Sequence, residues 1–191
     1  MSTQSTLLLL GDSIRLSYEG HVSQMLEGKA RVVGPAENCQ YSLFTLSSLN
    51  RWLATGRPDI VHWNNGLHDC GYNPDRSPVQ IPLEMYLANL EIILRKLRVL
   101  ASTVIWATTT PVHPDRPFRV TQWSWRNEEI EQYNQAACEL MEAKGIPVHD
   151  LHQVVCQDMD RLLCDDHLHL SSEGQTACAQ SVVDCVSNFL S

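Results

Sequence analysis

The chain has 191 residues, 43% hydrophobic and 19% charged, a composition typical of globular proteins rather than of disordered or collagen-like chains. Its net charge of −8 repels phosphate backbones and anionic membranes, so neither nucleic acid nor a membrane is an expected partner. The seven cysteines are odd in number and contain no Cys-x-x-Cys pair, which argues against a disulfide framework and a zinc-finger site. We expect one domain over residues 1–191, with free thiols and a cytoplasmic location.

Short apolar runs alternate with helical patterns along the chain. Five runs rich in leucine or β-branched residues are typical of strands, and they cover residues 6–10, 31–33, 59–64, 103–107 and 147–150. Five stretches with apolar residues at helical spacing are typical of helices, and they cover residues 14–26, 42–53, 83–97, 130–141 and 179–190. Ser171 or Ser172 suits the cap of the last helix.

This alternation predicts an α/β fold, with a mostly parallel five-stranded sheet and helices on both faces. In such sheets the functional site lies beyond the carboxyl ends of the strands. Residues directly after each strand are therefore the candidates for chemistry.

The first such segment is Gly11-Asp12-Ser13. A serine at a strand-to-helix turn exposes its hydroxyl at the sheet edge, and its N–H at a helix N-terminus stabilises an oxyanion. The same tripeptide is also ordinary turn chemistry. Arg15 and Tyr18, which follow, either orient Ser13 or face solvent.

A base that could activate Ser13 lies near the other end of the chain. In Asp165-Asp166-His167-Leu168-His169, the Asp166 and His169 pair has the i, i+3 spacing at which a carboxylate orients an imidazole for proton abstraction. The alternative is a solvated acidic loop that caps the last helix.

Polar residues also crowd the end of the third predicted strand. Asn64, Asn65 or His68 could donate a hydrogen bond to a developing oxyanion, although Asn-Asn-Gly alone is a turn signal.

Together these motifs resemble the SGNH (GDSL) hydrolase family, over nearly the whole chain. Gly11-Asp12-Ser13 is similar to the family's first block, and Asp166-x-x-His169 to its fifth. The resemblance implies a three-layer α/β/α sandwich with a flavodoxin-like sheet. It also implies an esterase or acyl-hydrolase with Ser13 as nucleophile, His169 as base and Asp166 as orienting acid, and no cofactor or metal.

Two positions depart from the family pattern. His68 occupies the slot of the oxyanion asparagine in the third block, and a neutral imidazole still donates one hydrogen bond. Cys39 occupies the slot of the second-block glycine, which acts through its N–H. The implied oxyanion donors are therefore Ser13, Cys39 and His68, with Asn64 as a supplement or replacement for His68.

The expected substrate is a small-molecule ester with a short acyl group such as acetyl, carried on a carbohydrate. Aromatic residues and an arginine stack on sugars or bind carboxylates, which makes Trp123, Trp125 and Arg126 candidate substrate contacts; the amide of Asn38 is another. The sequence leaves the oligomeric state open.

Two other functions are compatible with the residues. The group His149, Asp150, His152, Asp165, Asp166, His167 and His169 contains the ligand types of a zinc hydrolase, without a recognised spacing. The altered oxyanion positions also suit a non-catalytic ligand-binding module on the same fold.

Overall fold

The computed structural model describes residues 4–72, 79–116 and 123–190. Within them, one sheet of five parallel strands has the order β2-β1-β3-β4-β5. The strands are β1 (Ser5–Leu10), β2 (Ala30–Val33), β3 (Ile60–Trp63), β4 (Thr103–Ala107) and β5 (Val148–His149). This is the flavodoxin-like order, and it confirms the expected fold class, with a sheet that is parallel throughout.

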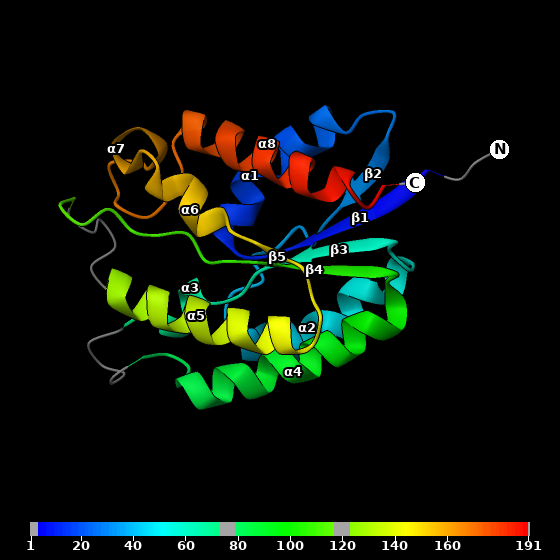
Figure 1. Cartoon of the computed structure of the whole chain (residues 1–191), viewed down its shortest axis with the longest axis horizontal. Helices are drawn as coiled ribbons and strands as arrows, with labels where there is room; N and C mark the ends of the chain where they lie inside the picture. Colours follow the sequence, from blue (N-terminus) through cyan, green and yellow to red (C-terminus); the bar gives the residue numbers. More distant parts are fainter. Residues whose placement is uncertain (1–3, 73–78, 117–122, 191) are drawn as a thin grey trace.

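Helices cover both faces of the sheet and complete three layers (Figure 1). One face carries two long helices that pack on each other and two short ones beside them: α1 (Ser13–Met25), α8 (Ser172–Ser187), α6 (Leu151–Cys156) and α7 (Met159–Leu162). The opposite face carries α2 (Ser42–Trp52), the 3-10 helix η1 (Leu53–Thr55), α3 (Leu67–Cys70), α4 (Leu83–Leu100) and α5 (Asn127–Ala143).

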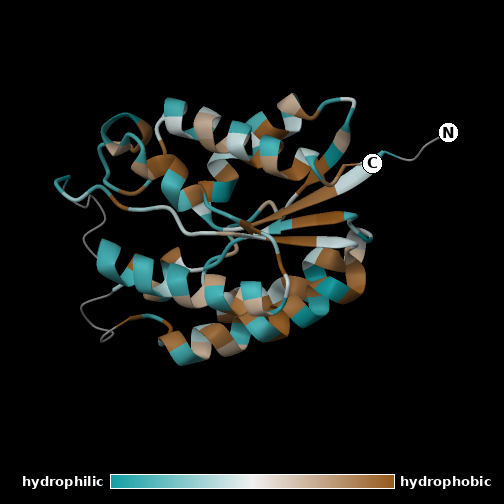
Figure 2. Cartoon of the chain, in the orientation of Figure 1, coloured by the Kyte–Doolittle hydropathy of each residue, from teal (hydrophilic) through white to brown (hydrophobic). Residues whose placement is uncertain are grey.

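The central strands are mostly apolar because both of their faces are covered, and His62 in β3 is a buried exception. Leu7, Leu8, Leu9 and Leu10 of β1 are at most 5% exposed, and β3 is buried at every position. The strands appear brown in Figure 2, whereas the helices alternate brown and teal. A strand buried on both faces loses the alternation of a half-exposed strand. The uninterrupted leucine run is therefore a core strand.

Side-chain caps begin the two helices that flank the site. Asp12 caps α1 by accepting from the Ile14 N–H at 2.9 Å. Ser171 caps α8 by accepting from the Gly174 N–H at 3.1 Å, as one of the two expected serines. These caps fix where the segments next to Ser13 and His169 enter their helices.

Three short helices, α3, α6 and α7, were not predicted. Each has six residues or fewer, too few for a helical period to show in the sequence. Gly66 begins α3 with φ +146°, and a Cβ there would lie 2.3 Å from Thr109 Oγ1. This glycine lets β3 turn directly into a helix.

All seven cysteines are free thiols, as their number and spacing indicated. None of the helices in the described ranges combines the length and apolar character needed to cross a bilayer.

Candidate active site

Ser13, His169 and Asp166 form a continuous hydrogen-bonded chain. Ser13 is the first residue of α1, and its Oγ lies 3.1 Å from Nε2 of His169. On the other side of the ring, Nδ1 lies 2.6 Å from Oδ2 of Asp166. The structure thus brings together the three residues expected as nucleophile, base and orienting acid.

Asp166 also receives backbone hydrogen bonds. Its Oδ1 accepts from the N–H groups of His169 at 3.0 Å and Leu168 at 3.2 Å. Partial burial raises the pKa of Asp166, but these bonds and the His169 ring outweigh it and hold the pKa below its ordinary value. Asp166 is therefore ionised at neutral pH and fixes a proton on Nδ1, which leaves Nε2 facing Ser13 as an acceptor.

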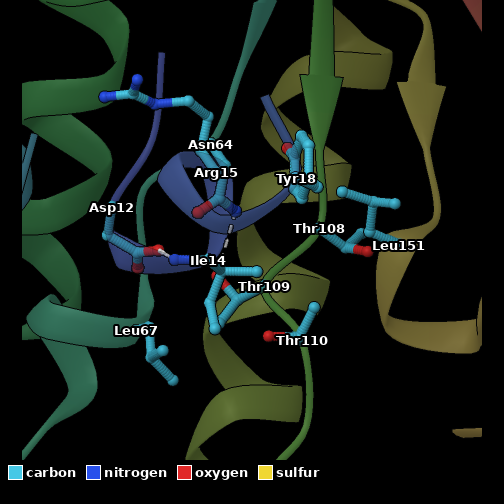
Figure 3. Close-up of a pocket in the computed structure, with 10 residues that line it drawn as sticks. All are labelled: Asp12, Ile14, Arg15, Tyr18, Asn64, Leu67, Thr108, Thr109, Thr110 and Leu151. Carbon is cyan, nitrogen blue, oxygen red and sulfur yellow. Dashed lines mark hydrogen bonds between the residues drawn. The ribbon is translucent and has the colours of Figure 1, made fainter. Parts of the chain in front are cut away.

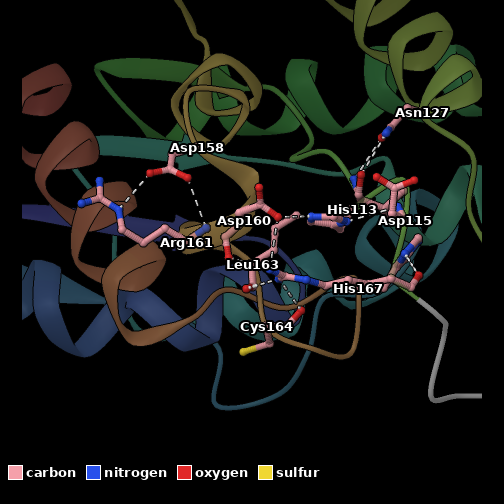
Figure 4. Close-up of polar contacts among 11 residues, drawn as sticks. His113, Asp115, Asn127, Asp158, Asp160, Arg161, Leu163, Cys164 and His167 are labelled. Carbon is pink, nitrogen blue, oxygen red and sulfur yellow. Dashed lines mark hydrogen bonds and ion pairs between the residues drawn. The ribbon is translucent and has the colours of Figure 1, made fainter.

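Residues before α5 hold the segment that carries Asp166 and His169 (Figure 4). Arg116 donates to the carbonyls of Asp160 and Leu163 at 2.6 Å each. In return, His167 donates from Nδ1 to the Arg116 carbonyl at 2.5 Å. His167 has φ +78°, a left-handed conformation that costs a non-glycine residue about 1 kcal/mol or more, so this clamp holds a backbone that the chain alone would not favour.

The expected oxyanion donor at Cys39 is already engaged. Its N–H donates to the carbonyl of Gly11 at 3.1 Å. The N–H of Gln40, the next residue, donates to Oδ1 of Asn38 at 2.7 Å. The Gly11 carbonyl, directly after β1, needs a hydrogen-bond donor. It receives the Cys39 N–H, which the family resemblance had assigned to the substrate oxyanion.

Asn64 is likewise engaged and does not fit the role of an oxyanion donor. Its Nδ2 donates to the Ala107 carbonyl at 2.8 Å and to Thr109 Oγ1 at 3.3 Å, which uses both of its N–H groups. Asn64 therefore joins the ends of β3 and β4.

His68, in α3, and Asn38, in the loop between β2 and α2, face each other. Nε2 of His68 lies 3.5 Å from Nδ2 of Asn38, and both residues are half-buried. Because Asn38 Oδ1 is held by the Gln40 N–H, the amide presents Nδ2 to the histidine. The sequence left His68 and Asn64 open as the side-chain donor to the oxyanion. Of these two, only His68 has a nitrogen that is not held by another strand, and it lies beside the Asn38 amide.

A hollow of about 370 Å³ opens beside His68. Its walls are Gln40, Tyr41, His68, Gln80, Trp123 and Trp125. The two tryptophan rings are stacked, with centroids 6.4 Å apart, and Trp125 Nε1 donates to the Leu67 carbonyl at 2.7 Å. The expected contacts Trp123 and Trp125 thus lie next to the site.

Arg126 is not among the residues that line this hollow. It is exposed, donates to the Tyr72 hydroxyl, and pairs with Glu129 at 2.7 Å. The expectation that Arg126 contacts substrate is therefore not supported by its position.

A second cavity, of about 10 Å³, lies where the ends of β1, β3 and β4 meet (Figure 3). It is lined by Asp12, Ile14, Arg15, Tyr18, Asn64, Leu67, Thr108, Thr109, Thr110 and Leu151. A cavity of this size holds one water molecule at most.

A comparison with protein-family models matched residues 16–177 to the GDSL-like Lipase/Acylhydrolase family. The chain belongs to this family. The match begins after Ser13, so the expected role of Ser13 is supported by the geometry around it and not by this match. No match was found among curated proteins.

Solved structures share the fold of this GDSL-like chain at low sequence identity. A lipase/acylhydrolase from Enterococcus faecalis has a TM-score of 0.82 at 22% identity, covering 98% of each chain. An acetylxylan esterase, Axe2 from Geobacillus stearothermophilus, has a TM-score of 0.75 at 18% identity, covering 96% of this chain and 95% of its own. The acetyl xylan esterase AlAXEase has a TM-score of 0.77 at 15% identity, covering 95% and 99%.

The histidines considered for a zinc site have other partners in the GDSL-like fold. His149 contacts His62 at 2.9 Å and Ser181 at 2.8 Å. Within the described ranges, no group of three or more His, Cys, Asp or Glu residues is placed to hold a metal ion.

Arg15 and Asp69 adjoin the site of this GDSL-like chain. The sequence left Arg15 open between orienting Ser13 and facing solvent, and it gave Asp69 no role. Arg15 is 1% exposed and Asp69 is fully buried, so neither faces solvent. The sequence did offer one indication of their importance. Each is a charged residue next to a candidate motif, and a charged residue needs partners if it is buried.

Proposed function

We propose that this chain is a serine esterase that acts on short acyl esters through Ser13, His169 and Asp166. Family membership supports a hydrolase that acts on esters. The observation that carries the serine mechanism is the 3.1 Å contact between Ser13 Oγ and His169 Nε2, with Asp166 on the far side of the ring.

The geometry supports a two-step reaction. Ser13 Oγ attacks the ester carbonyl while His169 Nε2 takes its proton, and Asp166 stabilises the imidazolium. The tetrahedral intermediate collapses, and the alcohol leaves with the proton from His169. Water then attacks the acyl-serine, giving its proton to the same nitrogen, and collapse releases the carboxylic acid and restores Ser13.

We propose that the oxyanion is held by the Ser13 N–H together with Asn38 Nδ2 and His68 Nε2. Two donors 3.5 Å apart can both reach one oxygen at about 2.9 Å from each. This requires the His68 tautomer with hydrogen on Nε2. Each such donor contributes about 3 kcal/mol to lowering the barrier.

The hollow beside His68 supports a carbohydrate as the leaving group. The indole of the half-buried Trp123, which stacks on the buried Trp125, offers an apolar face to a sugar ring, and Gln40 and Gln80 offer amides to its hydroxyls. The expected substrate is therefore an acetylated sugar, the class named for two of the similar structures.

The test is intact-mass analysis after exposure to a fluorophosphonate. We expect one adduct on wild type and none on Ser13→Ala or His169→Ala, because labelling requires an activated serine. A folded wild-type chain that forms no adduct would contradict the proposal and would favour the binding module.

A further inference from the structure

Arg15 is a buried cation in an unfavourable place. It lies in the first turn of α1, where the helix dipole disfavours positive charge. Only 1% of its side chain is exposed, and Glu19 pairs with it at 2.6 Å. A guanidinium in this position needs acceptors for all of its N–H groups.

Apart from Glu19, the oxygen acceptors of Arg15 are main-chain carbonyls on two segments beside the site. NH1 donates to Pro35 and NH2 to Glu37, each at 2.9 Å. Nε and NH2 both lie 3.4 Å from the Gly11 carbonyl. One side chain thus joins the turn before Ser13 to the loop between β2 and α2.

The residues on both sides of Asn38 in the sequence are held by hydrogen bonds. Glu37, directly before it, is bonded to Arg15, and Cys39, directly after it, donates to the Gly11 carbonyl at 3.1 Å. Asn38 itself lies outside the helices and strands of the described chain. Its position relative to Ser13 is therefore set by the Arg15 bonds and by the Cys39 N–H bond to Gly11, and not by a helix or strand.

We propose that Arg15 is a positioning residue that places the Asn38 amide for the oxyanion. The inference rests on the proposed esterase function. Arginine suits this task because its planar fork binds several carbonyls at fixed angles, whereas lysine offers one flexible point charge. Arg15 touches neither substrate nor Ser13 Oγ in this arrangement and acts through Asn38.

A double-mutant cycle tests this role. We expect Arg15→Lys to lower kcat for p-nitrophenyl acetate about tenfold with KM nearly unchanged, a part of the loss seen when an oxyanion donor is removed. Asn38→Ala should lower kcat about 100-fold. On the Asn38→Ala background, Arg15→Lys should have no further effect on kcat, because the group it positions is gone.

Glu19→Gln is the matched control. It removes the ion pair but leaves the carbonyl contacts of Arg15, so its melting temperature should fall while kcat stays within about twofold of wild type. Arg15→Gln, which keeps two donors, replaces Arg15→Lys if the lysine variant does not melt cooperatively.

Two results overturn the role of Arg15 and leave the esterase standing. One is an unchanged kcat in a folded Arg15 variant, and the other is a loss of kcat that persists in full on the Asn38→Ala background. A wild-type chain without turnover and without the fluorophosphonate adduct would instead refute the underlying function.

Discussion

Asp69 accepts both the backbone N–H of Ser42, at 2.9 Å, and its hydroxyl, at 2.5 Å. The carboxylate thereby joins α3, which carries His68, to the first residue of α2, which follows the Asn38 loop. Asn89 donates to the same Ser42 hydroxyl at 3.0 Å, so the link is part of a buried network. The contact between Asp69 and Ser42 therefore helps to fix the position of His68 relative to Asn38, the two proposed side-chain donors.

Burial raises the pKa of Asp69 to about 7, although the Ser42 bonds oppose part of the rise. A carboxyl with a raised folded pKa stabilises the fold fully below its unfolded pKa of about 3.9, and this contribution is lost as pH rises through about 7. Relative to Asp69→Asn, wild type should lose about 1.4 kcal/mol of unfolding free energy between pH 6 and pH 8. Urea denaturation at both pH values measures this, and a pH-independent difference would contradict it.

The buried pair of His62 and His149 should make the fold sensitive to acid. Burial lowers the pKa of His149 to about 4, and burial and the neighbouring ring lower that of His62 well below its ordinary value. Both rings are neutral in the folded state, so stability is full above about pH 6.5 and falls as pH drops towards 4. The fall should reach about 1.4 kcal/mol per pH unit for each ring.

His149→Gln should flatten this slope, whereas His21→Gln, which changes a histidine outside the pair, should leave it as in wild type. Denaturation curves at pH 5 and pH 7 measure the difference. Equal slopes in all three proteins would show that the pair does not control acid stability.

His68 and Asn64 should separate catalysis from stability. His68→Ala should slow acylation by p-nitrophenyl acetate about 100-fold with little change in melting temperature, because it removes a proposed oxyanion donor. Asn64→Ala should cost about 1–3 kcal/mol of stability because it removes the two hydrogen bonds that Nδ2 makes to the end of β4 and to Thr109. Stopped-flow acylation and thermal melts measure both, and an unchanged rate in His68→Ala removes His68 from the mechanism.

Arg116 should control the order of the segment that carries Asp166. Arg116→Ala removes the bonds to the carbonyls of residues 160 and 163 and should increase hydrogen exchange over residues 160–169, with a loss of about 1–3 kcal/mol. Arg161→Ala is the control, since its pair with Asp158, at 3.2 Å, is largely exposed and contributes less than about 1 kcal/mol (Figure 4). Equal exchange in the two variants would argue against the clamp.

Trp123 should determine affinity for the sugar but not for a small ester. Trp123→Ala should raise KM for acetylated xylobiose about tenfold, the effect of about 1.4 kcal/mol of stacking, and leave KM for p-nitrophenyl acetate within about twofold. Arg126→Ala, which changes an exposed residue that does not line the hollow, should change neither constant. A tryptophan variant that binds both substrates as wild type does would remove the carbohydrate assignment.

The sheet could be predicted from sequence because its strands carry a strong signal. The leucines of β1 and the residues of β3 are buried on both faces, and a continuous apolar run such as that of β1 is typical of a core strand. The pairing of Asp166 with His169 was also readable, because an i, i+3 spacing is local. Short-range patterns of this kind can be recognised in the sequence without knowledge of the tertiary contacts.

The oxyanion donors could not be read in the same way. Whether an N–H is available depends on which carbonyl lies opposite it, and the partner of the Cys39 N–H is the carbonyl of Gly11, 28 positions earlier and directly after β1. Asn64 has the right chemistry at the right place, but its amide is used by β4. Availability of a donor is a property of the assembled sheet and not of the motif.

The contact between Ser13 and His169 spans 156 positions of the chain, and it depends on α8 packing against α1. Ser13 is therefore synthesised well before His169, and the proposed nucleophile has no base to activate it until α8 has packed against α1. Under the proposed mechanism, a serine-directed probe added during synthesis should label only chains in which α8 has already packed against α1, so labelling would report when this long-range contact forms.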